Sequence, residues 1–111
     1  MSDIIKPLTA APVLPKCSSF EYLFPSAGSK EFSPAAGLDD SAVAFIDGLT
    51  DRRLTRRQVK ENALRLASGL KKMGLKHGDV ACVHGLNTLE WLNALLGCQA
   101  ARVIFSPANF A

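Results

Sequence analysis

A strand, a helix and a second strand follow one another in the last third of the chain, and this unit constrains the fold most. The first strand is predicted over residues 79–84, where four successive apolar residues occur. The helix is predicted over 87–101 and the second strand over 103–105. Such a connection crosses over right-handed and makes the two strands parallel. We therefore expect an α/β fold in which the first strand is buried on both faces.

The helix of this unit is apolar around most of its circumference. Asn87 and Glu90 form a capping signature at its start. Projected at about 100° per residue, the other polar positions fall in a narrow strip with Glu90, formed by Asn93 and Gln99. A helix of this kind must be buried on more than one side.

A hairpin and an amphipathic helix are predicted before this unit. The apolar run 42–47 and residues 52–55 read as two strands joined by a turn over 48–51. Thr55 and Gln58 then form a capping box. The helix should end at Gly74, a residue suited to the left-handed stop. Its apolar stripe is predicted to be Val59, Ala63, Leu66, Leu70 and Met73.

Residues 1–40 differ in composition from the rest of the chain. They contain five of the six prolines, so we predict a partly irregular leader that lies along a surface. Its one apolar anchor is the segment 20–24. We divide the chain into this leader and a folded portion, residues 41–111.

The composition is that of a small intracellular domain. The 111 residues are 48% hydrophobic and 21% charged, with a net charge of +3. Three widely spaced cysteines, Cys17, Cys82 and Cys98, indicate buried thiols in a reducing compartment rather than a disulfide framework. No signal peptide and no apolar run of about 18 residues is present, so we expect no membrane span and a cytoplasmic protein.

Few side chains could carry chemistry, and each has a simpler structural interpretation. His77 and His84 lack metal-ligand spacing and read as turn and strand-end residues. Asp39, Asp40 and Asp47 occupy turn contexts rather than a general acid and base pair. We therefore assign no catalytic and no metal-binding residue.

Two loops were considered as phosphate-binding sites. Residues 25–29 lack the Gly-Lys-Ser/Thr of a P-loop. Residues 84–90 do join a strand to a helix, so that helix N-terminus could attract an anion. They contain one glycine where a dinucleotide fingerprint has three, and we interpret them as ordinary capping. We assign no cofactor-binding residue.

Basic residues are concentrated around the amphipathic helix, and a basic helix can contact nucleic-acid phosphates. The segment 79–84 reads as a strand where a helix–turn–helix module would place its second helix. A solvated helix face is therefore the preferred interpretation, and nucleic-acid binding is not expected. The basic residues between 52 and 76 are Arg52, Arg53, Arg56, Arg57, Lys60, Arg65, Lys71, Lys72 and Lys76.

The order and spacing of these elements, from Ala42 to Asn109, resemble the N-terminal part of adenylate-forming enzymes, the AMP-binding superfamily. The resemblance is greatest to the acyl-CoA synthetase and coumarate–CoA ligase branch. It is carried by AFIDGLTDRRLT, the helix with its Gly-Leu and Gly-Asp-Val, LNTLEWLNALLGCQAA and VIFSPAN.

The resemblance implies a fold and an activity. Residues 41–111 would be the incomplete N-terminal subdomain of an AMP-dependent synthetase/ligase, which uses ATP, Mg and coenzyme A to form an acyl-adenylate and then an acyl-CoA. The family's phosphate loop, adenine motif, ribose-binding aspartate and catalytic lysine lie beyond the matched region. We therefore expect no cofactor for this chain alone.

Four positions depart from the family pattern. Arg56 replaces a tyrosine, Leu86 a proline, Arg102 a glycine and Phe110 a proline. Arg102 should sit at a left-handed helix stop, which costs an arginine about 1 kcal/mol or more.

These observations leave three readings. The preferred one is a truncated or incomplete acid–CoA ligase that does not catalyse adenylation alone. The second is an interaction or regulatory module that docks on a full-length ligase through an exposed apolar helix, 87–101, and an edge strand, 103–105. The third, which we expect least, is a basic nucleic-acid-binding module.

Overall fold

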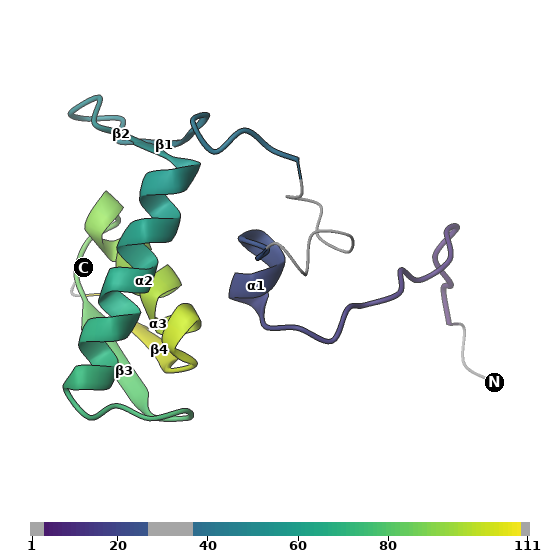
Figure 1. Cartoon of the computed structure of the whole chain (residues 1–111). Helices are drawn as coiled ribbons and strands as arrows, with labels where there is room; N and C mark the ends of the chain where they lie inside the picture. Colours follow the sequence, from purple (N-terminus) through teal and green to yellow (C-terminus); the bar gives the residue numbers. More distant parts are fainter. Residues whose placement is uncertain (1–3, 27–36, 110–111) are drawn as a thin grey trace.

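The computed structural model describes residues 4–26 and 37–109. Its elements are α1 (Ser19–Leu23), β1 (Val43–Ile46), β2 (Arg53–Thr55), α2 (Arg56–Lys72), β3 (Val80–His84), α3 (Leu89–Ala101) and β4 (Ile104–Ala108). The order is that of the predicted α/β fold (Figure 1). Residues 27–36 of the predicted leader, most of the loop 25–29 and Phe110 lie outside the described residues.

The predicted hairpin and its turn are confirmed. β1 and β2 pair antiparallel, and the register shifts between Val43 and Phe45, so that a bulge bends β1. The hairpin sits on the first turn of α2, where the N–H groups of Arg56 and Arg57 donate to the carbonyls of Ala42 and Asp40 at 3.0 and 2.9 Å. These bonds use N–H groups that have no partner within the helix.

Both predicted ends of α2 are confirmed. The Thr55 hydroxyl accepts the Gln58 N–H while the Gln58 side chain accepts the Thr55 N–H, which is the predicted capping box. Gly74 has φ +97, the left-handed conformation that glycine adopts without strain.

The apolar stripe of α2 is shorter than predicted. Val59, Ala63 and Ala67 are buried, but Met73 is 77% exposed. Met73 is the C-cap, beyond the last regular turn, so it does not continue the stripe.

The predicted parallel pair is also confirmed, with corrected boundaries. β3 pairs with β4 in a register that runs from Val80 opposite Ile104 to His84 opposite Ala108. β4 is therefore longer than the predicted strand 103–105 and includes Pro107. Proline is tolerated because β4 has β3 as its only partner among the described residues and so lies at an edge.

The helix that joins these strands begins later than predicted. Thr88, not Asn87, is the N-cap, and its hydroxyl accepts the Trp91 N–H at 3.2 Å. Threonine and asparagine are both preferred N-cap residues, and the apolar periodicity did not distinguish the two positions. The end at Ala101 is confirmed, with Arg102 in the predicted left-handed conformation at φ 59.

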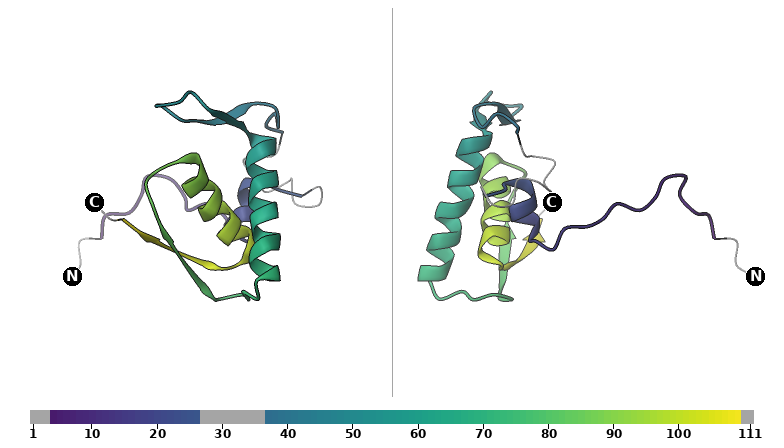
Figure 2. Two further views of the ribbon diagram at one scale, coloured as in Figure 1. Left: turned by 90° about the vertical axis from the view of Figure 1, so that its left-hand side faces the viewer. Right: turned by 45° about the vertical axis from the view of Figure 1, so that its right-hand side comes forward.

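α3 lies between α2 on one side and the β3–β4 pair on the other (Figure 2). Every α3 residue except Glu90 is buried or half-buried, which confirms burial on more than one side. In the predicted polar strip only Glu90 is exposed to solvent. The Oδ1 atom of Asn93 and the Oε1 atom of Gln99 are buried and have no hydrogen-bond partner among the described residues.

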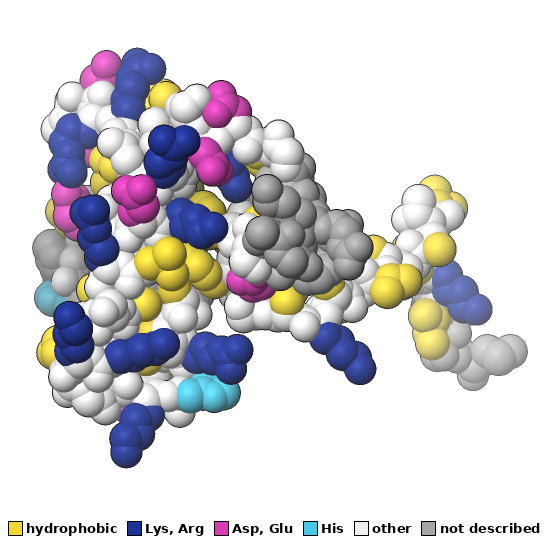
Figure 3. All heavy atoms as spheres, viewed as in Figure 1, with side chains coloured by type: hydrophobic (Ala, Val, Ile, Leu, Met, Phe, Trp, Pro, Cys, Tyr) yellow, Lys and Arg dark blue, Asp and Glu magenta, His cyan; other side chains and the backbone are white. Residues whose placement is uncertain are grey.

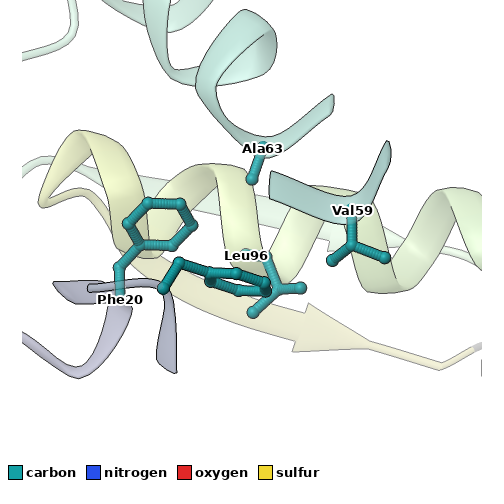
Figure 4. Close-up of a cluster of buried hydrophobic side chains, with 5 residues drawn as sticks. Phe20, Val59, Ala63 and Leu96 are labelled. Carbon is teal, nitrogen blue, oxygen red and sulfur yellow. The ribbon is translucent and has the colours of Figure 1, made fainter. Parts of the chain in front are cut away.

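Two apolar clusters hold the layers together. The first joins Phe20 and Phe24 of the α1 segment to Val59, Ala63 and Leu96 (Figure 4). The anchor predicted at 20–24 is thus a helical turn that packs against the α2–α3 pair. The second cluster lies nearer the end of α3 and contains Ala67, Cys98, Ala101 and Val103.

The prediction that β3 is buried on both faces is wrong for the described residues. Ala81 packs toward the second cluster, together with Phe105 of β4. The opposite face, which we call the open face, is exposed at Val80 (60%), Cys82 and Ile104 (54%). Parallel sheets are normally covered on both faces, so this one lacks a layer.

Candidate functional site

The histidines occupy the positions predicted for them. His77 lies in the turn between α2 and β3, and His84 is the last residue of β3. In residues 4–26 and 37–109, no three His, Cys, Asp or Glu side chains are placed to hold a metal ion.

The candidate aspartates hold turns together. Asp39 accepts from the backbone N–H and the hydroxyl of Ser41, and these bonds lower the pKa of Asp39. Asp47 accepts from the Leu49 N–H at 2.9 Å, which lowers its pKa in the same way. Asp40 contributes its backbone carbonyl to the start of α2. Asp39 and Asp47 therefore accept hydrogen bonds from neighbouring residues in the chain, as expected of turn residues.

Only one of the three cysteines is a buried thiol. Cys98 is 2% exposed, and its burial raises the pKa of the thiol. Cys17 is half-buried and Cys82 is exposed, so the prediction of buried cysteines is wrong for Cys82. Cys82 lies on the open face. Its apolar neighbours in β3 had led us to expect that a layer of structure covers this face.

The N-terminus of α3, considered above as an anion site, is capped by Thr88 and followed by Glu90. Arg52, from the hairpin, donates to Glu90 at 2.7 Å and lowers the pKa of that carboxyl. Both side chains are more than half exposed, so the pair adds little stability. The pair links the turn of the hairpin to the first turn of α3.

A cavity of about 560 Å³ lies between the hairpin, the α1 segment and α3. Its volume is within the range of small-molecule sites. Its lining is apolar apart from Asp39 and Arg56, and both of these already make bonds to neighbouring protein groups. The cavity therefore lacks the convergent polar groups that orient a ligand.

Arg56 is the least ordinary charged residue near this cavity. Its Nη2 donates to the Leu23 carbonyl at 3.1 Å, and its guanidinium carbon lies 5.4 Å from the centre of the Phe24 ring. Its Nε is buried without a hydrogen-bond partner among the described residues. From the sequence, Arg56 stood out as a departure from the family's tyrosine and as one of the basic residues between 52 and 76. Its contact with Leu23 could not be predicted, because the two residues are 33 positions apart.

Apart from Arg56 and the half-buried Lys60, the basic residues of α2 form a solvated face, as preferred from the sequence. Arg57, Arg65, Lys71 and Lys72 are exposed, and basic side chains spread over this side of the molecule (Figure 3). Lys71 and Lys72 lie in the last turn, where positive charge interacts favourably with the helix dipole. β3 follows α2, where a helix–turn–helix module would have a second helix.

The open face and the free edges of β3 and β4 leave apolar side chains and backbone groups uncovered among the described residues. In the predicted docking helix, 87–101, the apolar side chains of α3 are all buried or half-buried. On this unit of strands and helix, exposed apolar side chains are found on the strands, at Val80 and Ile104. The expectation that the helix supplies an exposed apolar surface is therefore corrected, because α2, α1 and the sheet already cover it.

No helix within residues 4–26 and 37–109 is long and apolar enough to cross a lipid bilayer.

Comparison with known proteins identifies the fold. The sequence profile of the AMP-binding enzyme family matches residues 33–111. 4-Coumarate–CoA ligase 4 of Arabidopsis thaliana is 32% identical over 89 residues, which are 80% of this chain and 15% of that protein. Acyl-CoA ligase azaF of Aspergillus niger is 37% identical over 60 residues, 54% of this chain and 11% of that protein.

Solved structures show the same architecture. The fatty acid AMP ligase from Legionella pneumophila matches 59% of this chain and 11% of that chain, with a TM-score of 0.55 and 28% identity. The N-terminal subdomain of NpsA from Klebsiella oxytoca matches 60% of this chain and 17% of that chain, with a TM-score of 0.56 and 25% identity.

The chain thus spans no more than 15% of the length of these curated relatives. Its hairpin, α2 and the β3–α3–β4 unit are an incomplete N-terminal subdomain of the adenylate-forming fold. The chain belongs to the family of AMP-binding enzymes.

Proposed function

We propose that residues 41–111 are the N-terminal portion of an ATP-dependent acid–CoA ligase, preceded by a leader over 1–40, and that they supply framework rather than reacting groups. The names of the relatives, which include 4-coumarate–CoA ligase, acyl-CoA ligase and feruloyl-CoA synthase, support acid–CoA ligation as the parent activity. ATP, Mg and coenzyme A are the reactants and cofactors that the family implies. A cytoplasmic location is part of the proposal.

The observation that carries this proposal is the role of the titratable side chains. Asp39 and Asp47 hold turns, Glu90 pairs with Arg52, and Cys98 is buried among apolar residues. Asp39 does line the 560 Å³ cavity, but its carboxylate accepts from Ser41, and no second general acid or base is among the described residues that line the cavity. Acid and base catalysis needs groups that are within reach of a bound substrate and not held by local backbone. We infer that this chain does not form an acyl-adenylate by itself.

The test is ATP–pyrophosphate exchange by purified residues 1–111 with aromatic and aliphatic carboxylic acids. We expect no exchange above an enzyme-free blank. The Arabidopsis 4-coumarate–CoA ligase 4, assayed in parallel with 4-coumarate, serves as the positive control. Exchange that depends on one of the acids would overturn the proposal that the chain is inactive alone.

A second candidate function, an interaction module, is supported by the open face. Val80 and Ile104 are neighbours across the strand pair and are both exposed, and each strand has a free edge. A partner that adds a strand or a covering layer would bury this surface. The partner we propose is a full-length ligase of the same family, because its sheet has the matching architecture.

Binding of residues 1–111 to a full-length relative, measured by light scattering, tests this second function. V80D should abolish binding because it buries a carboxylate at the interface. L49D is the matched control, since Leu49 is equally apolar and 98% exposed at the hairpin tip. A monomer with no affinity for the relative, or equal loss in both variants, would argue against the module.

We do not extend the proposal to nucleic acids. The basic face of α2 has the positive charge for phosphate contact, but α2 contains no aromatic side chain on which bases could stack. Binding to random-sequence DNA that weakens steeply with added salt would contradict this.

A further inference from the structure

The side of α2 that is turned away from the core, together with the turn that follows it, carries a concentrated positive charge. Six basic residues and one acid lie between positions 57 and 76, a net charge of +5, while the whole chain has +3. The rest of the chain is therefore slightly negative. We call this surface the basic face; its basic members are Arg57, Lys60, Arg65, Lys71, Lys72 and Lys76, of which Lys60 is half-buried and the others are exposed.

Contacts inside the molecule do not account for these charges. No residue of the basic face belongs to an ion pair among the described residues. Arg57 acts electrostatically on Asp39, whose pKa is lowered mainly by Ser41 and to a smaller extent by Arg57. The helix dipole favours Lys71 and Lys72 in the last turn, but it opposes Arg57 in the first turn, where no acid lies. The positive charge therefore remains available to a partner.

A leucine lies in the middle of the basic face. Leu64 is 47% exposed, and helical spacing puts it on one ridge with Lys60, one turn before it, and Lys71, two turns after it. Apolar side chains are visible between the basic ones on this side of the molecule (Figure 3). Basic side chains around a small apolar centre are typical of helices that lie in the interface of a bilayer.

This composition favours a lipid surface over a nucleic acid. Lysine and arginine can lay their apolar stems along the interface and keep their charged heads among the lipid phosphates. Clusters of about four to eight such residues on a helix bind anionic membranes, and the basic face falls in this range. An exposed leucine gains free energy in the headgroup layer, whereas nucleic-acid phosphates offer it no apolar surroundings.

We propose that the basic face of α2 is a docking surface for a membrane that contains anionic phospholipids. The basic side chains contact the lipid phosphates, and Leu64 enters the headgroup layer between them. Because the rest of the chain is net negative, the field of the membrane also orients the molecule with α2 toward the bilayer. The association is peripheral, and Val59, Ala63 and Ala67 stay buried in the protein core.

Sedimentation of residues 1–111 with lipid vesicles tests this docking surface. The probe is vesicles of phosphatidylcholine in which about a third of the lipid is phosphatidylserine. We expect the chain to bind these vesicles, to bind them less as salt is added, and not to bind vesicles of phosphatidylcholine alone.

A double substitution in the last turn of α2 locates the charge that matters. K71Q combined with K72Q should lower the partition coefficient about twentyfold, because each basic residue near an anionic surface raises affinity about fivefold. Glutamine is also a good helix former, so α2 should remain intact. K6Q combined with K16Q removes the same charge from two exposed positions of the leader and is the matched control. It should leave binding nearly unchanged.

A neutral substitution tests the apolar contact. L64Q keeps the net charge and should lower the partition coefficient about fivefold, because less apolar surface enters the headgroup layer. I104Q is the matched control: Ile104 is similarly exposed, at 54%, but it lies on the open face, with α3 between its sheet and α2. It should bind vesicles as the unmodified chain does.

Three results would overturn the proposal. The first is no binding to the anionic vesicles even at low salt. The second is equal loss in the two double variants, which would mean that net charge alone attracts the chain. The third is tighter binding to random-sequence DNA than to the vesicles, unaffected by L64Q, which would make nucleic-acid phosphates the partner of the basic face.

Discussion

At the scale of single residues, Gly97 sets how closely α2 and α3 approach. A Cβ atom at this position would lie 2.5 Å from Leu66 Cδ2 and 2.8 Å from Leu66 Cβ. Leu66 Cβ is fixed by its own backbone, so the helices would have to separate. G97A should therefore lower the free energy of unfolding by about 1–2 kcal/mol, even though alanine favours a helix.

The matched control for Gly97 is Gly69, which lies inside α2 with nothing within 4 Å of the added Cβ. G69A should raise the free energy of unfolding by about 0.5–1 kcal/mol, because alanine has the higher helix propensity. Urea denaturation measures both changes. Equal effects of the two substitutions would show that Gly97 is not in close contact with Leu66.

Arg102 carries backbone strain that a glycine would relieve. It ends α3 at φ 59 and ψ 32, a left-handed conformation that costs side chains with a Cβ about 1–2 kcal/mol. R102G should therefore raise the melting temperature. R65G, in the interior of α2, should lower it by the usual cost of glycine in a helix. An R102G variant that is no more stable than the parent would contradict the inference that Arg102 is strained.

The hairpin turn should weaken in acid because of Asp47. The Leu49 N–H, bonded to this carboxylate, holds the pKa of Asp47 below its ordinary value near 4. A depressed folded-state pKa gives stability that is complete above the unfolded pKa and is lost as pH falls through the folded pKa. The loss therefore occurs below about pH 4.

Carboxyl NMR titration measures this pKa, and Asp47 should titrate below an unstructured aspartate. D47N should flatten the acid side of the melting-temperature profile, where the parent declines. Titration of Asp47 at or above the unstructured value would show that the turn bonds do not favour its ionised form.

Much of the residue-scale picture was accessible from the sequence, because it depends on neighbours in the chain. The capping box of Thr55, the left-handed Gly74 and Arg102, and the turn roles of Asp39 and Asp47 were all predicted. The contact of Arg56 with Leu23 was not, because local patterns carry no information about partners 33 positions away.

At the scale of elements, the start of α3 shows that the sequence pattern located the helix but not the residue that caps it. The sequence favoured Asn87 as the cap, while the structure shows Thr88 bonded to the Trp91 N–H. T88A should lower the free energy of unfolding by about 1 kcal/mol, the usual cost of losing a cap, and N87A should change it little. Thermal unfolding of both variants decides between them, since the opposite ranking would restore Asn87 as the cap.

The order of the elements and the parallel pairing were predictable because the hydrophobic periods of strand and helix differ. The end of β4 was not, because Ser106 and Pro107 resemble a turn in sequence and pair only because β3 lies beside them. The apolar run of β3 correctly indicated a strand, but the prediction that both of its faces are buried was wrong for the described residues, because burial depends on which elements pack against the strand.

At the scale of the whole molecule, the described fold is a helix pair and two small sheets that leave apolar surface uncovered. The family could be inferred from the order of weak motifs, and the fold comparison agrees with it. The parent's acid substrate could not be inferred, since no described side chain converges on a substrate-shaped site. The described residues therefore identify the family but not the acid.

The framework role is tested most directly by a chimera. In 4-coumarate–CoA ligase 4 of Arabidopsis, the segment that aligns with this chain, 15% of that protein, is replaced by the aligned residues of this chain. ATP–pyrophosphate exchange with 4-coumarate is then measured. If these residues supply only framework, we predict exchange within about tenfold of the parent ligase, a change of about 1.4 kcal/mol in the barrier. A folded chimera with no exchange above the blank would contradict the framework role.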